Sequence, residues 1–246
     1  MILSNEILFD RSPEKLELTN GEIHVFCASL DPPLWRLEQL AETLSKDECQ
    51  RAGRFHFQQD KNRFVAGRGI LREILGWLLG AVPRELVFSC SSRGKPRLAE
   101  PVAERFLHFN LAHCESLAVY AVSRASEVGI DLERIRPVLE TEEIVAHCFS
   151  EPERARWLSL PSDRRGEAFF NCWTRKEALL KATGEGIGGQ MDQIEVFFAG
   201  DVPGERRWLL RSLTPALDYT AAVAAEGHDA RVHCWKWPGE HRTIPR

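Results

Sequence analysis

The sequence predicts an α+β protein made of two pseudo-symmetric halves, each a long helix packed on a mainly antiparallel sheet. Two observations carry this prediction. A long helical segment followed by short strands with a hairpin occurs over residues 47–122, and the same order returns over residues 167–237. We therefore divide the chain into an N-terminal half, residues 1–125, and a C-terminal half, residues 126–246, and expect a ligand in the cleft between them.

The first half opens with a strand and continues with helices. Ile23–Cys27 is apolar and rich in strand-forming residues, and it follows the Asn20-Gly21 turn. Residues 34–44 predict a helix. Ser45 then offers an N-cap for the helical segment at residues 47–79.

That segment is the most basic part of the chain. Its cations are Arg51, Arg54, Lys61, Arg63, Arg68 and Arg72. Charge on a helix usually forms a solvated face, but Arg51 and Arg54 lie three residues apart and share one side. Two cations on one side are also able to hold a phosphate dianion, so both interpretations stay open.

After Gly80 the pattern changes to short strands and turns. Residues 86–89, 106–111 and 117–122 predict strands, and the last two form a hairpin. His113 is expected at the turn of this hairpin. A histidine there is either simply solvated or available to a ligand.

The second half begins with a strand that carries two carboxylates. Over Val128–Glu133, a period of two places Ile130 and Leu132 on one face and Asp131 and Glu133 on the other. The pair is either the polar outer face of a half-exposed strand or a site for a hard cation. Mg²⁺ would relieve the repulsion between two adjacent carboxylates.

The long helix of the second half is predicted over Phe169–Gly184, with Gly184 ending it. Its apolar arc consists of Phe169, Phe170, Trp173 and Leu180, and Asn171, Arg175 and Ala182 are expected to face away. Glu177 falls inside the arc and Lys181 at its edge. A surface Glu-Lys pair is worth only a few tenths of a kcal/mol. A carboxylate among aromatic rings instead requires compensation, for which a metal ion or a proton-transfer role would serve.

The remaining elements are shorter. Helices are predicted at residues 141–147 and after Ser150, which acts as an N-cap. Strands are predicted at Ile194–Phe198 and at residues 208–213, 219–225 and 232–237.

Composition excludes several classes of protein. The net charge of −4 gives no basic field for nucleic acid or for an anionic membrane surface. The 7 cysteines are scattered without a Cys-x-x-Cys pair, which argues against a disulfide framework and against a zinc site. Because no basic region followed by an apolar run begins the chain, a cytoplasmic, reduced protein is expected.

Each of the two acidic stretches is a weak signal alone, but their combination is specific for one kind of protein. Gly129-Ile130-Asp131-Leu132-Glu133, followed about forty residues later by Trp173-Thr174-Arg175-Lys176-Glu177 and Lys181, resembles the 4′-phosphopantetheinyl transferases, in particular the larger Sfp-type members. The resemblance runs from Leu44 to about Gly189. It includes Gly94-Lys95-Pro96 and Phe109-Asn110-Leu111-Ala112-His113. The family usually has serine at the position of Ala112 and often at that of Cys114, so one hydroxyl contact is expected to be missing.

The resemblance implies the family's fold of two α/β halves and transfer of the phosphopantetheine arm of coenzyme A to a serine of an apo carrier protein. Adenosine 3′,5′-bisphosphate is released. By the same resemblance Asp131, Glu133 and Glu177 match the Mg²⁺ ligands and Lys181 matches a lysine that contacts the pyrophosphate. Arg51, Lys95 and His113 match positions that hold coenzyme A. Asp131, Glu177 and Lys181 are then the expected catalytic residues, with Glu177 as the candidate base, directly or through a metal-bound water.

Two other functions were weighed against this one. A Mg²⁺-dependent nuclease would use a Glu-x-Lys spacing on a strand, but Glu133 is followed by Arg134 and Ile135, and the net charge is unsuited to DNA. A non-catalytic module that binds coenzyme A or a carrier protein would not need both Glu177 and Lys181. The expected partners are therefore coenzyme A and an apo acyl or peptidyl carrier protein, and we expect a monomer without a nucleic-acid or membrane partner.

Overall fold

The computed structural model describes residues 9–90, 94–99, 107–184, 191–196, 208–227 and 229–238. The helices are α1 (Leu34–Ala41), α2 (Lys46–Ala52), α3 (Gln58–Leu79), α4 (Thr141–Cys148), α5 (Glu151–Leu158) and α6 (Ser162–Thr183), with short 3-10 turns η1 (Pro83–Glu85) and η3 (Met191–Gln193). The strands are β1 (Asp10–Arg11), β2 (Glu22–Ser29), β3 (Phe88–Cys90), β4 (Pro96–Leu98), β5 (His108–Cys114), β6 (Leu117–Ser123), β7 (Val128–Arg134), β8 (Trp208–Leu213), β9 (Tyr219–Glu226) and β10 (Arg231–Lys236). The predicted α+β class is confirmed.

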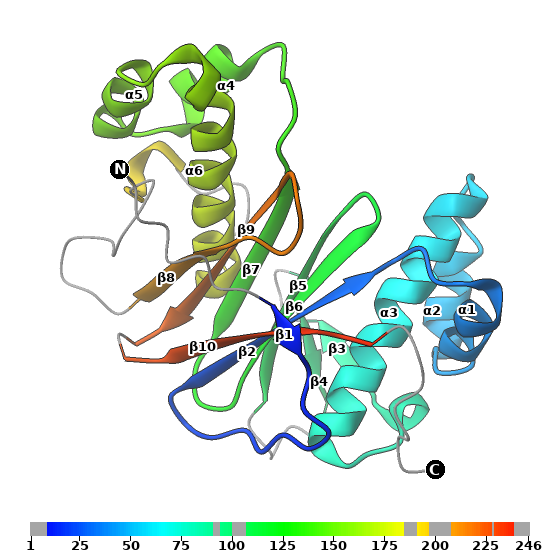
Figure 1. The fold of residues 1–246 in the computed structure, drawn as a ribbon. Helices are drawn as coiled ribbons and strands as arrows, with labels where there is room; N and C mark the ends of the chain where they lie inside the picture. Colours follow the sequence, from blue (N-terminus) through cyan, green and yellow to red (C-terminus); the bar gives the residue numbers. More distant parts are fainter. Residues whose placement is uncertain are drawn as a thin grey trace.

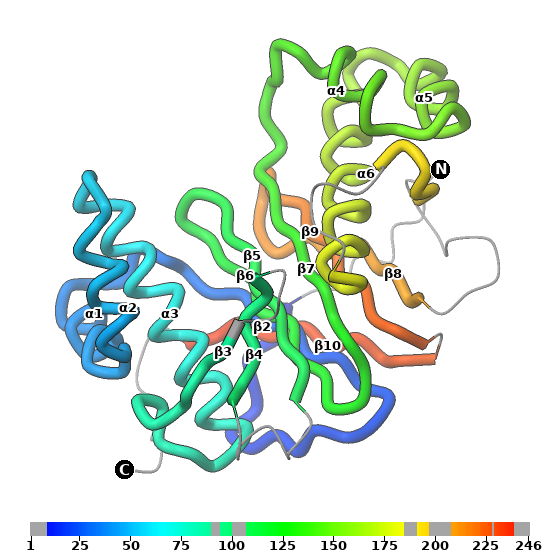
Figure 2. Tube along the Cα trace, turned by 180° about the vertical axis from the view of Figure 1, so that it is seen from behind, coloured from blue at the N-terminus to red at the C-terminus, as the bar shows by residue number. Residues whose placement is uncertain are grey.

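The two long helices cover the outer faces of two sheets, as Figures 1 and 2 show from opposite sides. The first sheet has the strand order β1-β10-β2-β6-β5 and the second has the order β7-β9-β8, while β3 and β4 form a separate hairpin. One core lies between α3 and the first sheet, a second between the two sheets, and a third between α6 and the second sheet. The protein thus has four layers, with a long helix on each outside.

Strand β7 shows how the period of two builds these layers. Ile130 and Leu132 are buried in the core between the sheets. Asp131 and Glu133 take the opposite face, which α6 covers. The predicted division of this strand into an apolar and an acidic face is confirmed.

The basic helical segment of the first half is broken into two helices. α2 starts from a Ser45 capping box closed by Glu48, which confirms the predicted N-cap. Gly53 ends α2, and the extended backbone of Phe57 (φ −96°, ψ 135°) starts α3. A single helix over residues 47–79 was therefore wrong at this junction, although the 22-residue α3 has the expected extent beyond it.

The orientation predicted for α6 was wrong in part. Arg175 and Ala182 are buried, and Asn171 Oδ1 accepts a hydrogen bond from Thr220 of β9. The reason is that these residues lie on the side of α6 that faces the second sheet, where Arg175 Nη1 donates to Ser212 of β8 and Ala182 packs against Gly129 of β7. Part of the predicted apolar arc packs elsewhere, since Phe169 stacks on Phe149 at the end of α4.

The last strand crosses back to the beginning of the chain. β10 pairs in parallel with β2, so it lies in the first sheet although it belongs to the second half in sequence. The division at residues 125/126 stays a prediction. Because β10 lies in the first sheet, one strand of the predicted second half is part of the sheet of the first half. The strand predicted at Ile194–Phe198 is not formed over residues 194–196, and Phe197 and Phe198 lie outside the described residues.

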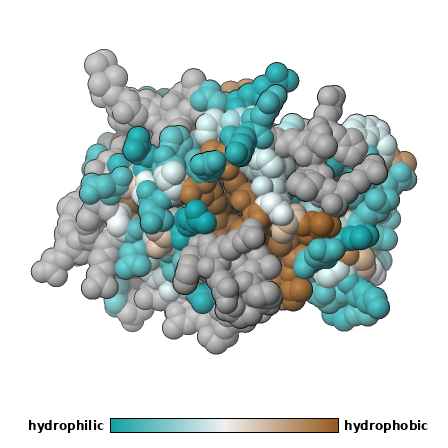
Figure 3. Space-filling model, turned by 90° about the horizontal axis from the view of Figure 1, so that it is seen from below, coloured by the Kyte–Doolittle hydropathy of each residue, from teal (hydrophilic) through white to brown (hydrophobic). Residues whose placement is uncertain are grey.

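The surface is largely polar on the face drawn in Figure 3, with apolar residues gathered near its centre and toward one side. Among the helices of the described ranges, none is both long enough and apolar enough to cross a membrane. Every cysteine whose side chain is described is free: Cys27, Cys49, Cys114, Cys148, Cys172 and Cys234.

Candidate active site

The site forms where α6 crosses β7. A Cβ atom built on Gly129 would lie 2.1 Å from the carbonyl oxygen of Ala178 and 2.3 Å from the backbone nitrogen of Ala182. Only glycine therefore allows the strand and the helix to approach this closely. This contact sets the next residues of β7 beside the helix turns that carry Glu177 and Lys181.

Lys181 joins the two elements by an ion pair. Its Nζ donates to Asp131 Oδ1 at 2.5 Å, and the lysine side chain is 32% exposed while that of Asp131 is 9% exposed. Asp131 Oδ2 is also buried and has no hydrogen-bond partner among the described residues. One oxygen of this carboxylate is thus neutralised and the other is left open.

The three acids share one electrostatic environment. Burial raises the pKa of Glu177 above its ordinary value, and Asp131 and Glu133 raise it further, whereas Lys181 opposes them. The pKa of Glu133 is raised by burial and then by Asp131, against Arg136. Burial likewise raises the pKa of Asp131, against Lys181. Each carboxylate therefore holds its proton more tightly than in water, as the sequence predicted for Glu177.

His113 reaches the same place from the first half. It is the residue before the last of β5, and the turn predicted for it falls instead at Glu115 and Ser116. Partial desolvation lowers the pKa of His113, and so do the nearby cations Lys181 and Arg63. The ring therefore favours its neutral form.

Asn110 fixes β5 against β7 at this point. Its buried Oδ1 accepts a hydrogen bond of 2.9 Å from the backbone nitrogen of Ile130, the neighbour of Asp131. Because β5 belongs to the first sheet and β7 to the second, this bond aligns the two halves at the site.

Two predicted residues belong to neighbouring features of the first half. Arg51 and Arg54 line an open hollow of about 600 Å³ together with Asp47, Gln50 and Phe55. Lys95 donates to Glu127 Oε2 at 2.8 Å and to the carbonyl oxygen of Val128 at 3.0 Å, just before the start of the acidic part of β7. Asp131, Glu133, Glu177, Lys181 and His113 are thus brought together, while Arg51 lines the hollow and Lys95 is held by Glu127 and Val128.

Comparison with known proteins identifies the family. A family model described as the 4′-phosphopantetheinyl transferase superfamily matches residues 127–231, and one described as the N-terminal part of 4′-phosphopantetheinyl transferase matches residues 30–125. The 4′-phosphopantetheinyl transferase HetI of Nostoc sp. is 41% identical over 229 residues, which are 92% of this chain and 96% of HetI. The chain belongs to the 4′-phosphopantetheinyl transferase superfamily. Its activity is the transfer of phosphopantetheine to carrier proteins, as predicted.

More distant relatives agree with the assignment. The 4′-phosphopantetheinyl transferase psf-1 of Bacillus pumilus is 34% identical over 152 residues, covering 62% of this chain and 63% of psf-1. Sfp of Bacillus subtilis is 26% identical over 160 residues, covering 65% of this chain and 68% of Sfp. The residues matched by the two family models, 30–125 and 127–231, together include every residue of the site described above.

Sequence reasoning missed one buried ion pair of this transferase. Lys176, next to Glu177, is fully buried and lies 2.7 Å from Glu153 Oε2. It also donates to the carbonyl oxygens of Met191 and Ile194. Lys176 therefore fastens the segment around η3 to α6 and turns away from the acids, so the two neighbouring residues serve different sides of the helix. The capping-box pattern at Ser150 and Glu153 gave no signal for this partner.

Proposed function

We propose that Asp131, Glu133 and Glu177 hold one Mg²⁺ ion against the diphosphate of coenzyme A, with Lys181 as the residue that contacts the diphosphate. The supporting observation is the crossing of β7 and α6, where Lys181 pairs with Asp131. At this crossing burial and the neighbouring carboxylates raise the pKa of Glu133 and that of Glu177. Carboxylate oxygens are the ligands Mg²⁺ prefers.

The donor chemistry fits such an ion. Three mutually repelling carboxylates and a buried Asp131 oxygen without a described partner are an arrangement that a hard divalent cation would stabilise. Within the described ranges, no three His, Cys, Asp or Glu side chains are yet arranged to hold a metal ion. The side chains therefore have to close around it. When bound, the ion supplies Lewis-acid stabilisation of the charge that develops on the diphosphate.

The residues of the chain perform the remaining steps. The serine oxygen of the carrier protein attacks the phosphorus that bears pantetheine. The bond from this phosphorus to the bridging oxygen breaks, so that adenosine 3′,5′-bisphosphate leaves with the electron pair. Lys181 stabilises the negative charge on the phosphate oxygens. Glu177, directly or through a bound water, accepts the serine proton, for which its raised pKa suits it.

The other expected contacts complete the proposal. Arg51, Lys95 and His113 hold the nucleotide side of coenzyme A, and Lys95 must then exchange its contact with Glu127 for one with the ligand. The apo acyl or peptidyl carrier protein docks on the half that contains Asp131 and Lys181. We further propose that the protein is cytoplasmic. We also propose that it is a monomer, because two halves in one chain complete the site.

The test is a mass measurement on an apo carrier protein incubated with the enzyme, Mg²⁺ and coenzyme A. We expect the carrier to gain the mass of one phosphopantetheine. Asp131→Ala and Glu177→Gln should each lower the transfer rate by at least about 100-fold, a typical contribution of a general base or charge-stabilising group. Thermal unfolding should show that both variants remain folded.

Glu167→Gln is the matched control, because Glu167 is an exposed glutamate of the same helix, 54% exposed and paired only at its surface with Arg164. It should keep full activity. If Glu177→Gln is as active as Glu167→Gln, the assignment of the site is wrong. If no carrier type gains mass with the wild-type enzyme, the proposed reaction itself is wrong.

A further inference from the structure

Lys181 acts on the whole acidic cluster. Its Nζ lies 2.5 Å from Asp131 Oδ1, and its positive charge also lowers the pKa of both Glu133 and Glu177. Arg136 contributes from the edge, 3.6 Å from Glu133 Oε2 with 51% of its side chain exposed.

The charges of the cluster do not balance. Three carboxylates face one central ammonium, and a partly exposed guanidinium adds only a screened contribution. Asp131 Oδ2 stays buried and without a described partner on the far side of the same carboxylate. The cluster therefore attracts a further cation while Lys181 already occupies its most buried acid.

Lys181 is able to leave this position. Its side chain is 32% exposed, whereas that of Asp131 is 9% exposed, so the lysine approaches from the solvent side of the site. A lysine carries its charge on a flexible four-carbon stem with three rotatable donors, unlike the planar guanidinium of arginine. Within the described ranges no three acids are yet arranged around a metal position, so metal binding requires a rearrangement of side chains.

We propose that Lys181 is an exchangeable internal counter-ion, which occupies Asp131 in the free enzyme and moves to the diphosphate when a divalent cation takes its place. The inference rests on the proposed function for the identity of both ligands. It adds that the cation and coenzyme A bind cooperatively. When either ligand binds first, the Lys181–Asp131 ion pair is broken, so the second ligand binds without that free-energy cost. By thermodynamic linkage, each ligand raises the affinity of the other by the same factor.

The experiment measures binding without turnover. Mn²⁺ binding to the full chain is followed by the electron paramagnetic resonance signal of free Mn²⁺, with and without coenzyme A and without a carrier protein. For Lys181→Met without coenzyme A, we expect Mn²⁺ to bind about tenfold more tightly than to the wild type, within the usual range of coupling between sites. Lys181→Arg keeps the charge and should not bind Mn²⁺ more tightly than the wild type.

Coenzyme A supplies the second part of the test. It should tighten Mn²⁺ binding to the wild-type enzyme by about tenfold and should have a smaller effect on Lys181→Met, because only the direct attraction between the cation and the diphosphate is left. Lys15→Met is the matched control, because it removes the same charge from a side chain that is 85% exposed and pairs with Glu17 instead of an acid of the site. It should reproduce the wild-type values.

The outcomes separate the two proposals. If Lys181→Met and Lys181→Gln both bind Mn²⁺ with wild-type or weaker affinity, while Asp131→Asn abolishes binding, the counter-ion inference is wrong and the metal site stands. If the wild-type enzyme binds no Mn²⁺ even with coenzyme A, the metal site and the inference fail together. Tighter binding by Lys181→Met that is lost again in a double variant with Asp131→Asn supports both.

Discussion

Gly129 controls the distance between the two elements that carry the acids. Its missing side chain lets the backbone of α6 pass where a Cβ atom would meet Ala178 and Ala182 at 2.1 and 2.3 Å. Both neighbours are backbone atoms of a helix, so neither is able to move without shifting the whole of α6. The glycine before Asp131 is thus a steric requirement of the site.

Gly129→Ala should lower the free energy of unfolding by about 3 kcal/mol, the upper part of the usual cost of overpacking. It should also reduce transfer, because Glu177 and Lys181 move away from Asp131. Urea unfolding gives the first quantity and carrier modification the second. Gly166→Ala is the control on the same helix, where a Cβ atom meets nothing within 4 Å. A gain of roughly 0.5–1 kcal/mol is expected there from helix propensity, and equal effects of the two substitutions would refute the steric argument.

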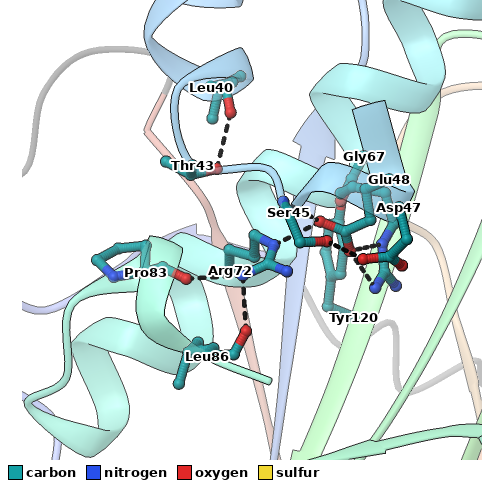
Figure 4. A network of polar contacts seen from close by, with 11 residues as sticks. Leu40, Thr43, Ser45, Asp47, Glu48, Gly67, Arg72, Pro83, Leu86 and Tyr120 are labelled. Carbon is teal, nitrogen blue, oxygen red and sulfur yellow. Dashed lines mark hydrogen bonds and ion pairs between the residues drawn. The ribbon is translucent and has the colours of Figure 1, made fainter. Parts of the chain in front are cut away.

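At the level of elements, an ion-pair network holds α2 on α3, as Figure 4 shows. Glu48 of α2 accepts from Arg68 and Arg72 of α3, at 2.5 and 2.7 Å. Arg72 continues to the carbonyl oxygens of Pro83 and Leu86, both at 2.9 Å. This network therefore also ties down the segment that follows α3.

Glu48→Gln should lower the free energy of unfolding by about 3 kcal/mol, because it leaves the buried Arg72 and the partly buried Arg68 without their counter-charge. Asp31→Asn breaks the Arg63 pair, in which Asp31 is 47% exposed, and should cost less than about 1 kcal/mol. Chemical denaturation of both variants measures the difference. Equal losses would mean that burial does not determine the strength of these pairs.

The sequence predicted most elements because local patterns specify them. Alternating residues gave β7, and the Ser45 and Ser150 caps gave the starts of two helices. Helical periodicity failed for Arg175, because the arc chosen as buried was the aromatic one, whereas Arg175 lies on the side of α6 that faces the second sheet and donates to Ser212 of β8. The sequence did not predict the break in the helix near Gly53, and it placed the hairpin turn at His113, a few residues too early. Tertiary packing determines where such elements end.

The residues of the candidate site were predicted from three different signals. Asp131 came from two carboxylates on one strand face, Glu177 from a carboxylate in apolar surroundings, and the role of Lys181 from the family resemblance. Their supports, Gly129 and Asn110, act through the backbone of distant residues, and spacing along the chain carries no signal for such contacts.

At the scale of the whole molecule, β10 near the end of the chain pairs with β2 near its beginning, and stacked aromatic rings join the two strands. His24 of β2 stacks on His233 at 5.0 Å, and the Trp235 indole donates to His24 Nδ1 at 3.0 Å. Burial lowers the pKa of His24 from 6.5 to about 4, assisted by His233 and opposed by Glu22. His24 is therefore neutral in the folded protein where it would be partly charged in the unfolded chain.

This lowered pKa makes stability depend on pH. The unfolded chain binds more protons than the folded protein between pH 6.5 and about 4, so stability is present above pH 6.5 and is lost as the pH falls through this window. At about 1.4 kcal/mol per pKa unit, the loss amounts to roughly 3 kcal/mol. The lowered pKa of Glu22, which Thr19 holds by a hydrogen bond, adds to it in the same direction.

Urea unfolding at a series of pH values tests this prediction. His24→Gln removes the titrating ring and keeps an acceptor for the Trp235 indole, so its stability should change less between pH 6.5 and 4. His147→Gln, at an exposed position of α4, should follow the wild type. A His24→Gln profile as steep as that of the wild type would show that the acid sensitivity arises elsewhere.

The proposed site lies where the two sheets meet, with β7 and α6 supplying the acids and β5 supplying His113. The most direct measurement is an anomalous difference map from crystals of the enzyme grown with Mn²⁺ and coenzyme A. The account predicts one Mn²⁺ peak bound by oxygens of Asp131, Glu133 and Glu177, with Lys181 on the diphosphate. A peak at another place, or a Glu177 carboxylate that stays apart from the cation, would contradict it.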